Sequence, residues 1–338
     1  MNNKVELINA YLHITNACEF KCPFCYASDI KICEGKSFFE TDKILKIIDI
    51  VGKSTIKNIS LVGGNPILHP DIFSIMKYIK STTNLNIILM TNTAEISLNK
   101  IEEYCSMIDV LMVTVHSNTP DMHDSITKMK NSYNNLMKAL LKFQKINPLA
   151  KIKVAVNITP YAYDRIYSIA ENVVNYGIKL DELVLQRIAP VSVDRMNEEF
   201  LVNATQANIA LSQAIDVRDK LNVKVDLVDP FPLCFVDEKN KEIVVPCKCG
   251  KTDININGNG DVSRCGADPN YQLGNIFVTP ISEIWNKPEL VNFRNKDYLP
   301  EECLNCNEKY VCGGGCPMSV LAYKKINKSH LVMFKEKK

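Results

Sequence analysis

The sequence lacks long apolar runs and any surplus of one charge. Nowhere do 18 apolar residues follow one another, and the first residues show no basic start, apolar run and small-residue cleavage site. Neither a membrane-spanning helix nor a secretion signal is therefore predicted. The 338 residues hold 40 Lys and Arg against 38 Asp and Glu. This balance leaves no basic field that could follow phosphates, which argues against a nucleic-acid binder.

Cysteine, in contrast, is abundant, with 13 residues. A chain with this many thiols in a reducing compartment more often binds metal than forms disulfides, so we expect a cytoplasmic metalloprotein. Three cysteines lie within eight residues, and seven lie between positions 247 and 316. Cys33 and Cys105 stand apart from both groups, and we expect them to be small apolar fillers.

From residue 11 to about residue 221, short apolar runs alternate with helical patterns. The expected strands are Tyr11–Ile14, Ile59–Val62, Ile87–Met90, Val110–Val115, Ile152–Ile158 and Leu183–Ile188. The expected helices are Thr41–Val51, Pro70–Lys80, Ser97–Cys105, Ser132–Ile146, Tyr163–Tyr176 and Asn203–Leu221. Repeated strand-then-helix units predict an α/β fold with a parallel sheet. Because polar or glycine-rich residues occur at every strand end, we expect a partial (β/α)6 TIM-like barrel with its site on that face.

The alternation of apolar runs and helical patterns ends near residue 225. Residues 225–245 hold two prolines and no clear helical period, and residues 252–266 resemble a hairpin that turns at 257–260. A segment with little core and many cysteines is expected to fold around metal. The predicted domains are therefore 1–225, the barrel, and 226–338, a small cysteine-rich iron–sulfur domain with a β-hairpin.

Cys18, Cys22 and Cys25 lie in the loop directly after the first expected strand. Zinc normally takes four ligands, usually as two separated pairs, whereas three close thiolates can hold three corners of an iron–sulfur cube. The fourth iron of such a cube has no protein ligand, and it is free to bind a substrate or cofactor. The alternative is an incomplete zinc knuckle or incidental thiols.

The triplet, with Phe24 before its last cysteine, resembles the CxxxCxΦC signature of the radical SAM superfamily. The resemblance implies a [4Fe-4S] cluster that binds S-adenosylmethionine (SAM) and cleaves it reductively to a 5′-deoxyadenosyl radical. It further implies that Phe24 lies by the adenine and that the glycine-rich motif Gly63-Gly64-Asn65 contacts SAM. Strands four to six would add contacts from the residues Thr114, Asn157 and Arg187.

Asn65 departs from the family pattern, which usually has Glu at this position. An amide oxygen can still accept a hydrogen bond from the SAM amine, although without charge assistance. The resemblance thus implies weaker SAM binding, and restoring Glu would be expected to tighten it by less than about tenfold.

Other residues near the strand ends have simpler interpretations. His13 and His116 are expected to be hydrogen-bonded wall residues rather than proton carriers. The acidic stretch 121–124 is expected to cap the start of a helix after the fourth strand rather than to bind metal.

The later cysteines resemble a SPASM extension, the auxiliary iron–sulfur domain of many peptide-modifying radical SAM enzymes. The spacings that carry this resemblance are Gly260-x4-Cys265 and Cys303-x2-Cys306-x5-Cys312-x3-Cys316. It implies one or two auxiliary [4Fe-4S] clusters. The alternative for the pair formed by Cys303 and Cys306 is an ordinary zinc site.

The ligand count departs from the SPASM pattern, because no cysteine follows Cys316 in this sequence. By family order the first auxiliary cluster would take Cys249, Cys265 and Cys316 with either Cys247 or Cys234, and spacing favours Cys247. Cys234 is then expected to be spare. The second cluster would keep Cys303, Cys306 and Cys312, with an open iron, a non-cysteine ligand or a borrowed upstream cysteine.

The resemblance as a whole implies an enzyme whose radical removes hydrogen from a residue of a ribosomally made peptide or protein. Crosslinking or side-chain oxidation would follow, and an external donor such as flavodoxin or ferredoxin would supply electrons. The enzymatic alternative is sulfatase-maturase-like formation of an aldehyde residue, but Gly266 stands where that type usually has an acid. The alternative from another class is an iron–sulfur electron carrier or sensor without SAM chemistry. Neither nucleic acid nor a membrane is an expected partner.

Overall fold

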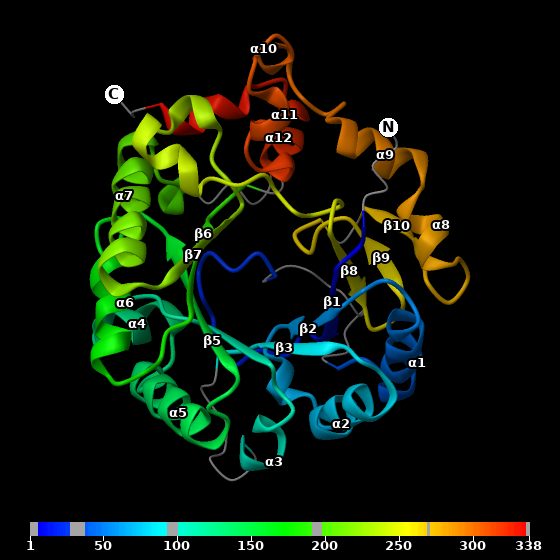
Figure 1. Cartoon of the computed structure of the whole chain (residues 1–338). Coiled ribbons are helices and arrows are strands. Elements are labelled where there is room, and N and C mark those ends of the chain that lie inside the picture. Colours follow the sequence, from blue (N-terminus) through cyan, green and yellow to red (C-terminus); the bar gives the residue numbers. More distant parts are fainter. Residues whose placement is uncertain (1–5, 28–37, 93–100, 191–197, 269–270, 336–338) are drawn as a thin grey trace.

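A computed structural model of the chain describes residues 6–27, 38–92, 101–190, 198–268 and 271–335. Ten strands form one sheet in the order β10-β9-β8-β1-β2-β3-β4-β5-β6-β7. The sheet curls into a ring with helices around its outside (Figure 1). Strand order follows chain order from β1 to β7, as it does in a barrel built from successive strand–helix units.

The barrel strands lie close to the positions that the sequence predicts. They are β1 (Asn9–Thr15), β2 (Asn58–Gly63), β3 (Asn86–Met90), β4 (Val110–Thr114), β5 (Lys151–Ile158) and β6 (Glu182–Arg187). Each pairs in parallel with the next along the chain. The expected partial (β/α)6 barrel is thus confirmed.

The helices of the barrel lie between these strands. They are α1 (Thr41–Gly52), α2 (Ile72–Thr82), α3 (Ile101–Cys105), α4 (Pro120–Thr127), α5 (Ser132–Ile146), α6 (Ile166–Asn175) and α7 (Ala204–Leu221). Helix α4 was not expected as a separate element. Asp124, near its end, accepts hydrogen bonds from the backbone N–H of Asn131 (2.5 Å) and Tyr133 (2.9 Å), so it caps α5 rather than its own helix. The part of the third expected helix before residue 101, and Cys33, lie outside the described residues.

The C-terminal part joins the barrel at both edges of the barrel sheet, next to β6 at one edge and next to β1 at the other. Strand β7 (Lys224–Val228) pairs in parallel with β6, so the expected domain boundary at 225 falls inside a strand. Strand β8 (Asp253–Asn257) pairs in parallel with β1 and antiparallel with β9 (Asp261–Ser263), which pairs with β10 (Gln272–Asn275). The hairpin at 257–260 is as expected, but it extends the barrel sheet instead of standing apart.

Short helices complete the C-terminal part. They are α8 (Ile281–Trp285), α9 (Pro288–Asn295), α10 (Glu301–Leu304), α11 (Lys309–Cys312) and α12 (Pro317–Lys324). Short 3₁₀ helices occur in the barrel at η1 (Pro66–Leu68) and η3 (Glu198–Phe200), and in the C-terminal part at η4 (Leu233–Phe235), η5 (Glu238–Ile243) and η6 (His330–Phe334). The apolar core continues into the C-terminal part, where it includes Cys265 and Cys316.

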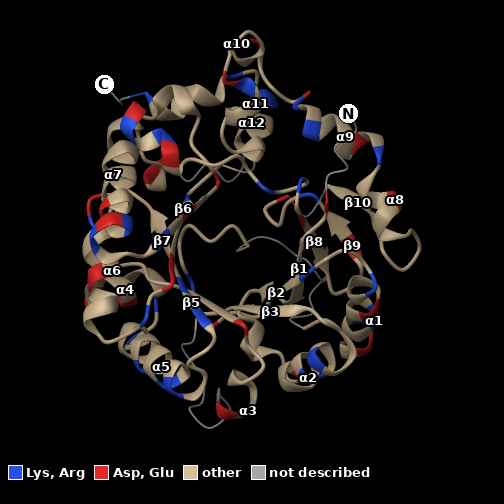
Figure 2. Cartoon of the chain, in the orientation of Figure 1, with Lys and Arg blue, Asp and Glu red and all other residues tan. Residues whose placement is uncertain are grey.

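One apolar core lies between the sheet and the outer helices. In α5 the buried residues follow the helical period, so one face packs on the strands while the charged residues face solvent. Lys, Arg, Asp and Glu accordingly lie mainly on the outer helices (Figure 2). Within the described residues, no helix is both long and apolar enough to cross a lipid bilayer.

Candidate radical SAM site and auxiliary cysteine sets

The three clustered cysteines emerge directly from the C-terminal end of β1. Cys18 and Cys25 are exposed and Cys22 is half-buried, and none of the three forms a disulfide. In Figure 1 the dark-blue segment that follows β1 runs through the middle of the ring. The triplet therefore lies on the barrel face where (β/α) folds carry their chemistry.

Two glycines at the end of β2 hold this loop in place. A Cβ at Gly63 would lie 2.1 Å from the Thr15 carbonyl oxygen, and one at Gly64 would lie 2.2 Å from that of Ala17. The backbone N–H groups of Gly64 and Asn65 donate to the same two carbonyls, at 2.9 and 2.7 Å. Only glycine permits this approach, so the motif braces the cysteine loop against β2.

Asn65 is buried and already has partners within the protein. Its Oδ1 accepts a hydrogen bond from Thr91 Oγ1 (2.7 Å), and its Nδ2 donates to Glu19 (2.8 Å) and to Asn92 Oδ1 (2.9 Å). The Asn65 oxygen has a second lone pair beyond the bond from Thr91, so the hydrogen bond from the SAM amine to it stays a prediction. The geometry gives Asn65 a positioning role toward Glu19.

Glu19 belongs to the cysteine loop itself, one residue after Cys18. Both of its carboxylate oxygens lie near Asn65 Nδ2, at 2.8 and 3.1 Å. Among the described residues it has no salt bridge. The family pattern usually has a carboxylate at position 65. In this chain the cysteine loop brings the carboxylate of Glu19 next to Asn65.

The donor set of the triplet fits an iron–sulfur cluster. Desolvation, with the neighbouring thiols, raises the pKa of Cys18 to about 11 and that of Cys22 to about 12. Bound metal reverses such shifts, because it stabilises the thiolate. Within the described residues, no group of three or more Cys, His, Asp or Glu side chains could hold one metal ion. A cube distributes its thiolates over separate irons, so they need not converge on one point.

An aromatic wall lies beside the triplet. Phe24 packs edge-on against His116 (5.6 Å between ring centroids) and Phe200 (5.3 Å). His116 also lies 3.9 Å from the Cys22 sulfur. Burial lowers the pKa of His116 to about 3 and that of His123 to about 4, so both rings are neutral near pH 7. This agrees with the expectation that His116 is a wall residue.

The three residues expected from strands four to six differ in their surroundings. Thr114 and Asn157 are half-buried at the ends of β4 and β5. Arg187 instead donates from Nε to the Asp229 carbonyl (2.9 Å) and from Nη2 to Ser319 Oγ (3.1 Å). Its guanidinium also lies 5.3 Å from the ring centres of Phe231 and Phe334. These partners tie β6 to the C-terminal part, and a contact of Arg187 with SAM stays a prediction.

Four of the later cysteines form what we call the first auxiliary set: Cys247, Cys249, Cys265 and Cys316. Hydrogen bonds with Cys247 and Cys265, together with burial, raise the pKa of Cys249. Burial and the nearby Asp229, Cys247 and Cys265 likewise raise the pKa of Cys316. The structure therefore brings Cys247, and not Cys234, to the other three.

The remaining cysteines of this part form the second auxiliary set: Cys234, Cys303, Cys306 and Cys312. Desolvation and the thiols of Cys312 and Cys306 raise the pKa of Cys234. Desolvation, with Cys312, Glu302, Cys234 and Cys306 as further causes, raises the pKa of Cys303 to about 11. Cys234 is thus not a spare residue in space, although sequence spacing had separated it from the others by almost 70 positions.

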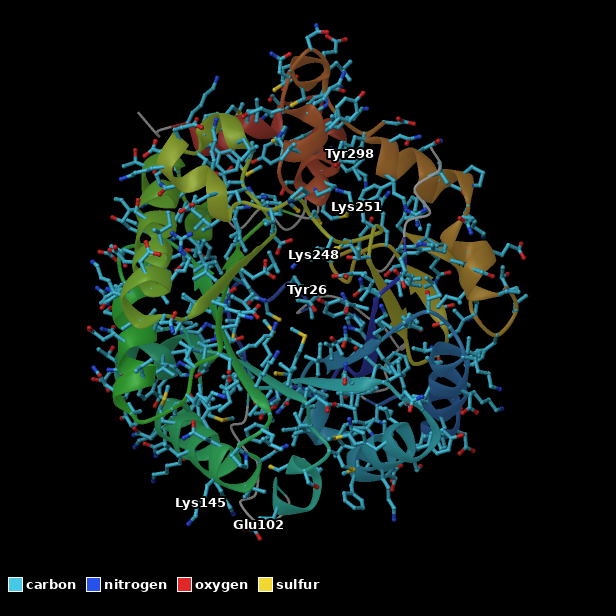
Figure 3. The ribbon with its side chains drawn as sticks, in the orientation of Figure 1. Tyr26, Glu102, Lys145, Lys248, Lys251 and Tyr298 are labelled. Atoms are coloured by element: carbon cyan, nitrogen blue, oxygen red, sulfur yellow. The ribbon has the colours of Figure 1, made fainter. Side chains whose placement is uncertain are left out.

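Two tyrosines lie between the cysteine groups. Tyr26 follows Cys25 and lies near the centre of the ring, and Lys248, Lys251 and Tyr298 lie above it in the view (Figure 3). Desolvation by the surrounding protein and the thiols of Cys25 and Cys265 raise the pKa of Tyr26. Tyr298 contacts both auxiliary sets electrostatically, through Cys247 and Cys316 on one side and Cys312 and Cys303 on the other. Three thiol groups therefore follow one another from the barrel centre outward.

Comparison with known proteins identifies both parts. The radical SAM superfamily model matches residues 12–159, and the SPASM model, an iron–sulfur cluster-binding domain, matches residues 247–307. This chain carries a radical SAM domain and a SPASM domain. The SPASM match covers Cys247 to Cys306, while Cys234, Cys312 and Cys316 lie outside it.

Some relatives match most of the chain at low sequence identity. The PqqA peptide cyclase of Rhizobium meliloti (strain 1021) is 20% identical over 320 residues, 91% of this chain and 82% of its own length. The AdoMet-dependent heme synthase of Methanosarcina barkeri (strain Fusaro / DSM 804) is 22% identical over 321 residues, 89% and 88% of the two chains. The structure of Streptococcus suis SuiB bound to precursor peptide SuiA superposes with a TM-score of 0.78 at 14% identity, over 98% and 76% of the chains.

Radical SAM domains bind a [4Fe-4S] cluster with SAM, and SPASM domains bind auxiliary iron–sulfur clusters, which establishes the cofactor classes of this chain. Two features of the site escaped the sequence. In the sequence, Glu19 follows a motif cysteine as an ordinary surface acid would. Only its hydrogen bonds with the buried Asn65 distinguish it. Cys234 had no spacing signal, because its partners are brought to it by tertiary structure.

Proposed function

We propose that this radical SAM enzyme removes hydrogen from a residue of a ribosomally made peptide or protein, leading to a crosslink or an oxidised side chain. One observation carries the proposal. The cysteine loop at the end of β1 opens into the ring, and the SPASM hairpin continues the same sheet directly beside it through β8. A catalytic cluster and an auxiliary cluster that act on one substrate need to lie close together. The pairing of β1 with β8 supports such an arrangement.

Within the proposal, Cys18, Cys22 and Cys25 hold the catalytic cluster, and Gly63 and Gly64 fix their loop. Glu19, positioned by Asn65, would accept hydrogen bonds from the SAM ammonium group. Phe24, Thr114 and Asn157 would line the rest of the SAM pocket; Phe24 offers a ring edge beside the triplet. The first auxiliary set would hold the nearer auxiliary cluster.

When bound and reduced by an external donor such as flavodoxin or ferredoxin, the cluster and SAM supply a 5′-deoxyadenosyl radical that removes a hydrogen atom. The chain's own contribution is a wall without charge. The neutral ring of His116 lies 3.9 Å from the Cys22 sulfur, and the neutral ring of His123 packs against His116.

The aldehyde-forming alternative is disfavoured by the surroundings of Gly266. A Cβ at this position would lie 2.9 Å from Asn255 Oδ1 and 3.3 Å from His13 Nε2. An acidic side chain therefore cannot stand after Cys265 without displacing these residues. A peptide crosslink or another side-chain oxidation fits the site better.

The first experiment separates the enzyme from an electron carrier. Anaerobically purified, reconstituted protein is incubated with SAM and dithionite, and 5′-deoxyadenosine is measured by chromatography and mass spectrometry. We expect 5′-deoxyadenosine to form. Its absence in protein with full iron content would contradict the proposal and leave the carrier or sensor reading.

The second experiment identifies the substrate. Short peptides encoded beside the gene are added, uniformly deuterated, and both products are analysed. We expect deuterium in the 5′-deoxyadenosine and loss of a pair of hydrogen atoms from the peptide. Because a heme synthase is among the relatives, formation of haem from a porphyrin in a parallel incubation, with every peptide unchanged, would overturn the peptide assignment.

We also propose a cytoplasmic location, because thiol-ligated clusters need a reducing compartment and every described cysteine is free.

A further inference from the structure

The segment that carries Cys234 is packed against the glycine loop between Cys312 and Cys316. Gly315 has φ +81°, and a Cβ there would lie 2.7 Å from the Pro230 carbonyl oxygen and 2.8 Å from the Pro232 nitrogen. The two backbones are therefore in direct contact. This contact fixes where the next residues of both segments must lie.

A hydrogen bond continues the contact toward the thiols. The backbone N–H of Leu233 donates to Cys312 Sγ at 3.3 Å. Backbone N–H donors to sulfur are typical of iron–sulfur ligands, whose charge and potential they adjust. Cys234 directly follows the donor in the turn η4, and its thiol interacts electrostatically with that of Cys312.

The other two thiols reach the same place from α10 and the turn after it. The backbone N–H of Cys306 donates to the Cys303 carbonyl (3.3 Å), so both thiols project from one tight turn. Cys234 interacts electrostatically with Cys312, Cys306 and Cys303. Conversely, Cys247 completes the first set.

We propose that Cys234 is the fourth ligand of a second auxiliary [4Fe-4S] cluster, with Cys303, Cys306 and Cys312. Each auxiliary set then offers four thiolates, the number that a fully ligated cube requires. The fourth ligand comes from the connection after β7, upstream of the residues that the SPASM model matches. The inference rests on the iron–sulfur class of this domain and is independent of the substrate proposed above.

The test uses the full chain with Cys18, Cys22 and Cys25 all changed to Ala, so that only auxiliary clusters contribute. In this parent we expect about eight irons per chain after anaerobic reconstitution. Adding Cys234→Ala should lower the content to about four, or to about seven with a three-iron signal in the electron paramagnetic resonance (EPR) spectrum of the oxidised protein. Cys105→Ala, a buried thiol outside both sets, is the matched control and should keep the parent's iron and spectrum.

The opposite results are equally specific. If Cys234→Ala keeps the parent's iron content and reduced EPR spectrum, the proposal is wrong. A parent that binds about one zinc and about four irons per chain would also overturn it, because the second set would then be a zinc site.

Cys234→Ser decides the matter if the Ala variant does not fold. A serine oxygen can replace the thiolate, so we expect the cluster to remain with a changed EPR spectrum and a lower reduction potential. An unchanged spectrum and potential would remove Cys234 from the ligand set. All these readouts are independent of peptide modification, so a failure of the proposed function would leave them intact.

Discussion

The cysteine loop after β1 and the two auxiliary sets hold the same chemical groups in opposite ways. The triplet Cys18, Cys22 and Cys25 lies within one short loop, and two of its thiols are exposed. The auxiliary thiols come from segments far apart in the chain, and Cys265 and Cys316 are buried. The first group is a local motif that the fold presents. The second is assembled by the fold, and its members can be recognised only together.

This difference predicts how each group responds to substitution. The thiols of Cys18 and Cys25 are exposed and lie outside the apolar core, so loss of their metal leaves that core covered. Cys265 and Cys316 belong to the core, so metal bound there also stabilises the surrounding structure. Substitutions should therefore separate catalysis from folding in the triplet and couple the two in the auxiliary sets.

The largest effect is expected from changing Cys18, Cys22 and Cys25 together to Ala. The variant should lose about four irons and all 5′-deoxyadenosine formation, while the auxiliary clusters remain. Iron analysis and product chromatography measure both. Continued 5′-deoxyadenosine formation would show that the catalytic cluster lies elsewhere.

Next in size is Cys249→Ala, which removes a member of the first auxiliary set that hydrogen-bonds to two others. We expect loss of this cluster and of peptide modification, with 5′-deoxyadenosine formation retained because the triplet lies in another loop. The melting temperature should also fall. Cys105→Ala, outside both sets, controls for the loss of a thiol; retained turnover in Cys249→Ala would make the nearer auxiliary cluster dispensable.

A smaller effect is expected from Asn65→Glu. The new carboxylate would face Glu19 and lose the donor that now binds it, so we expect SAM affinity to weaken by about tenfold and the free energy of unfolding to fall by about 2 kcal/mol. Calorimetric titration and urea unfolding measure the two. Asn86→Glu is the matched control, because Asn86 is exposed at the opposite end of the neighbouring strand β3. Tighter SAM binding in Asn65→Glu would restore the expectation drawn from the sequence.

The smallest effect is expected from Gly177→Ala, and it is compared with a larger one at Gly315, which has nearly the same φ. Gly177 has φ +85°, and a Cβ there would lie 3.9 Å from its nearest neighbour, whereas Gly315 has φ +81°, and a Cβ there would lie 2.7 Å from the backbone of the Cys234 segment. Gly177→Ala should lower the free energy of unfolding by about 1 kcal/mol, the cost of a left-handed alanine. Gly315→Ala should lower it by about 2 kcal/mol more through overpacking and release iron from the second auxiliary set. Equal values from urea unfolding would show that the two segments do not press on each other.

The sequence predicted the barrel well because its signals are local. Each strand is a short apolar run such as Ile152–Ile158, and each helix has a periodic face such as that of Ser132–Ile146. The cysteine loop was equally accessible, because its spacing and its position after β1 are both read along the chain. Parallel pairing between successive strands then follows from connection rules.

The rest depended on contacts between distant segments. The attachment of β8 to β1 joins residues more than 240 positions apart, so the C-terminal hairpin could be expected but not its place in the barrel sheet. Arg187 stands at a strand end as a SAM-binding residue would, and its hydrogen bonds to Asp229 and Ser319, residues 42 and 132 positions away, could not be read from the sequence. Cys234 is the same case, since a lone cysteine acquires a role only from its neighbours in space.

The pairing of β1 with both β2 and β8 has a consequence for the order of events on the ribosome. Strand β2 follows β1 closely in synthesis, but β8 is made only after all the other barrel strands. Until then one edge of β1 has unpaired backbone groups, which are a site for wrong pairing. The strand that carries the radical chemistry is thus among the first to be made and the last to be enclosed.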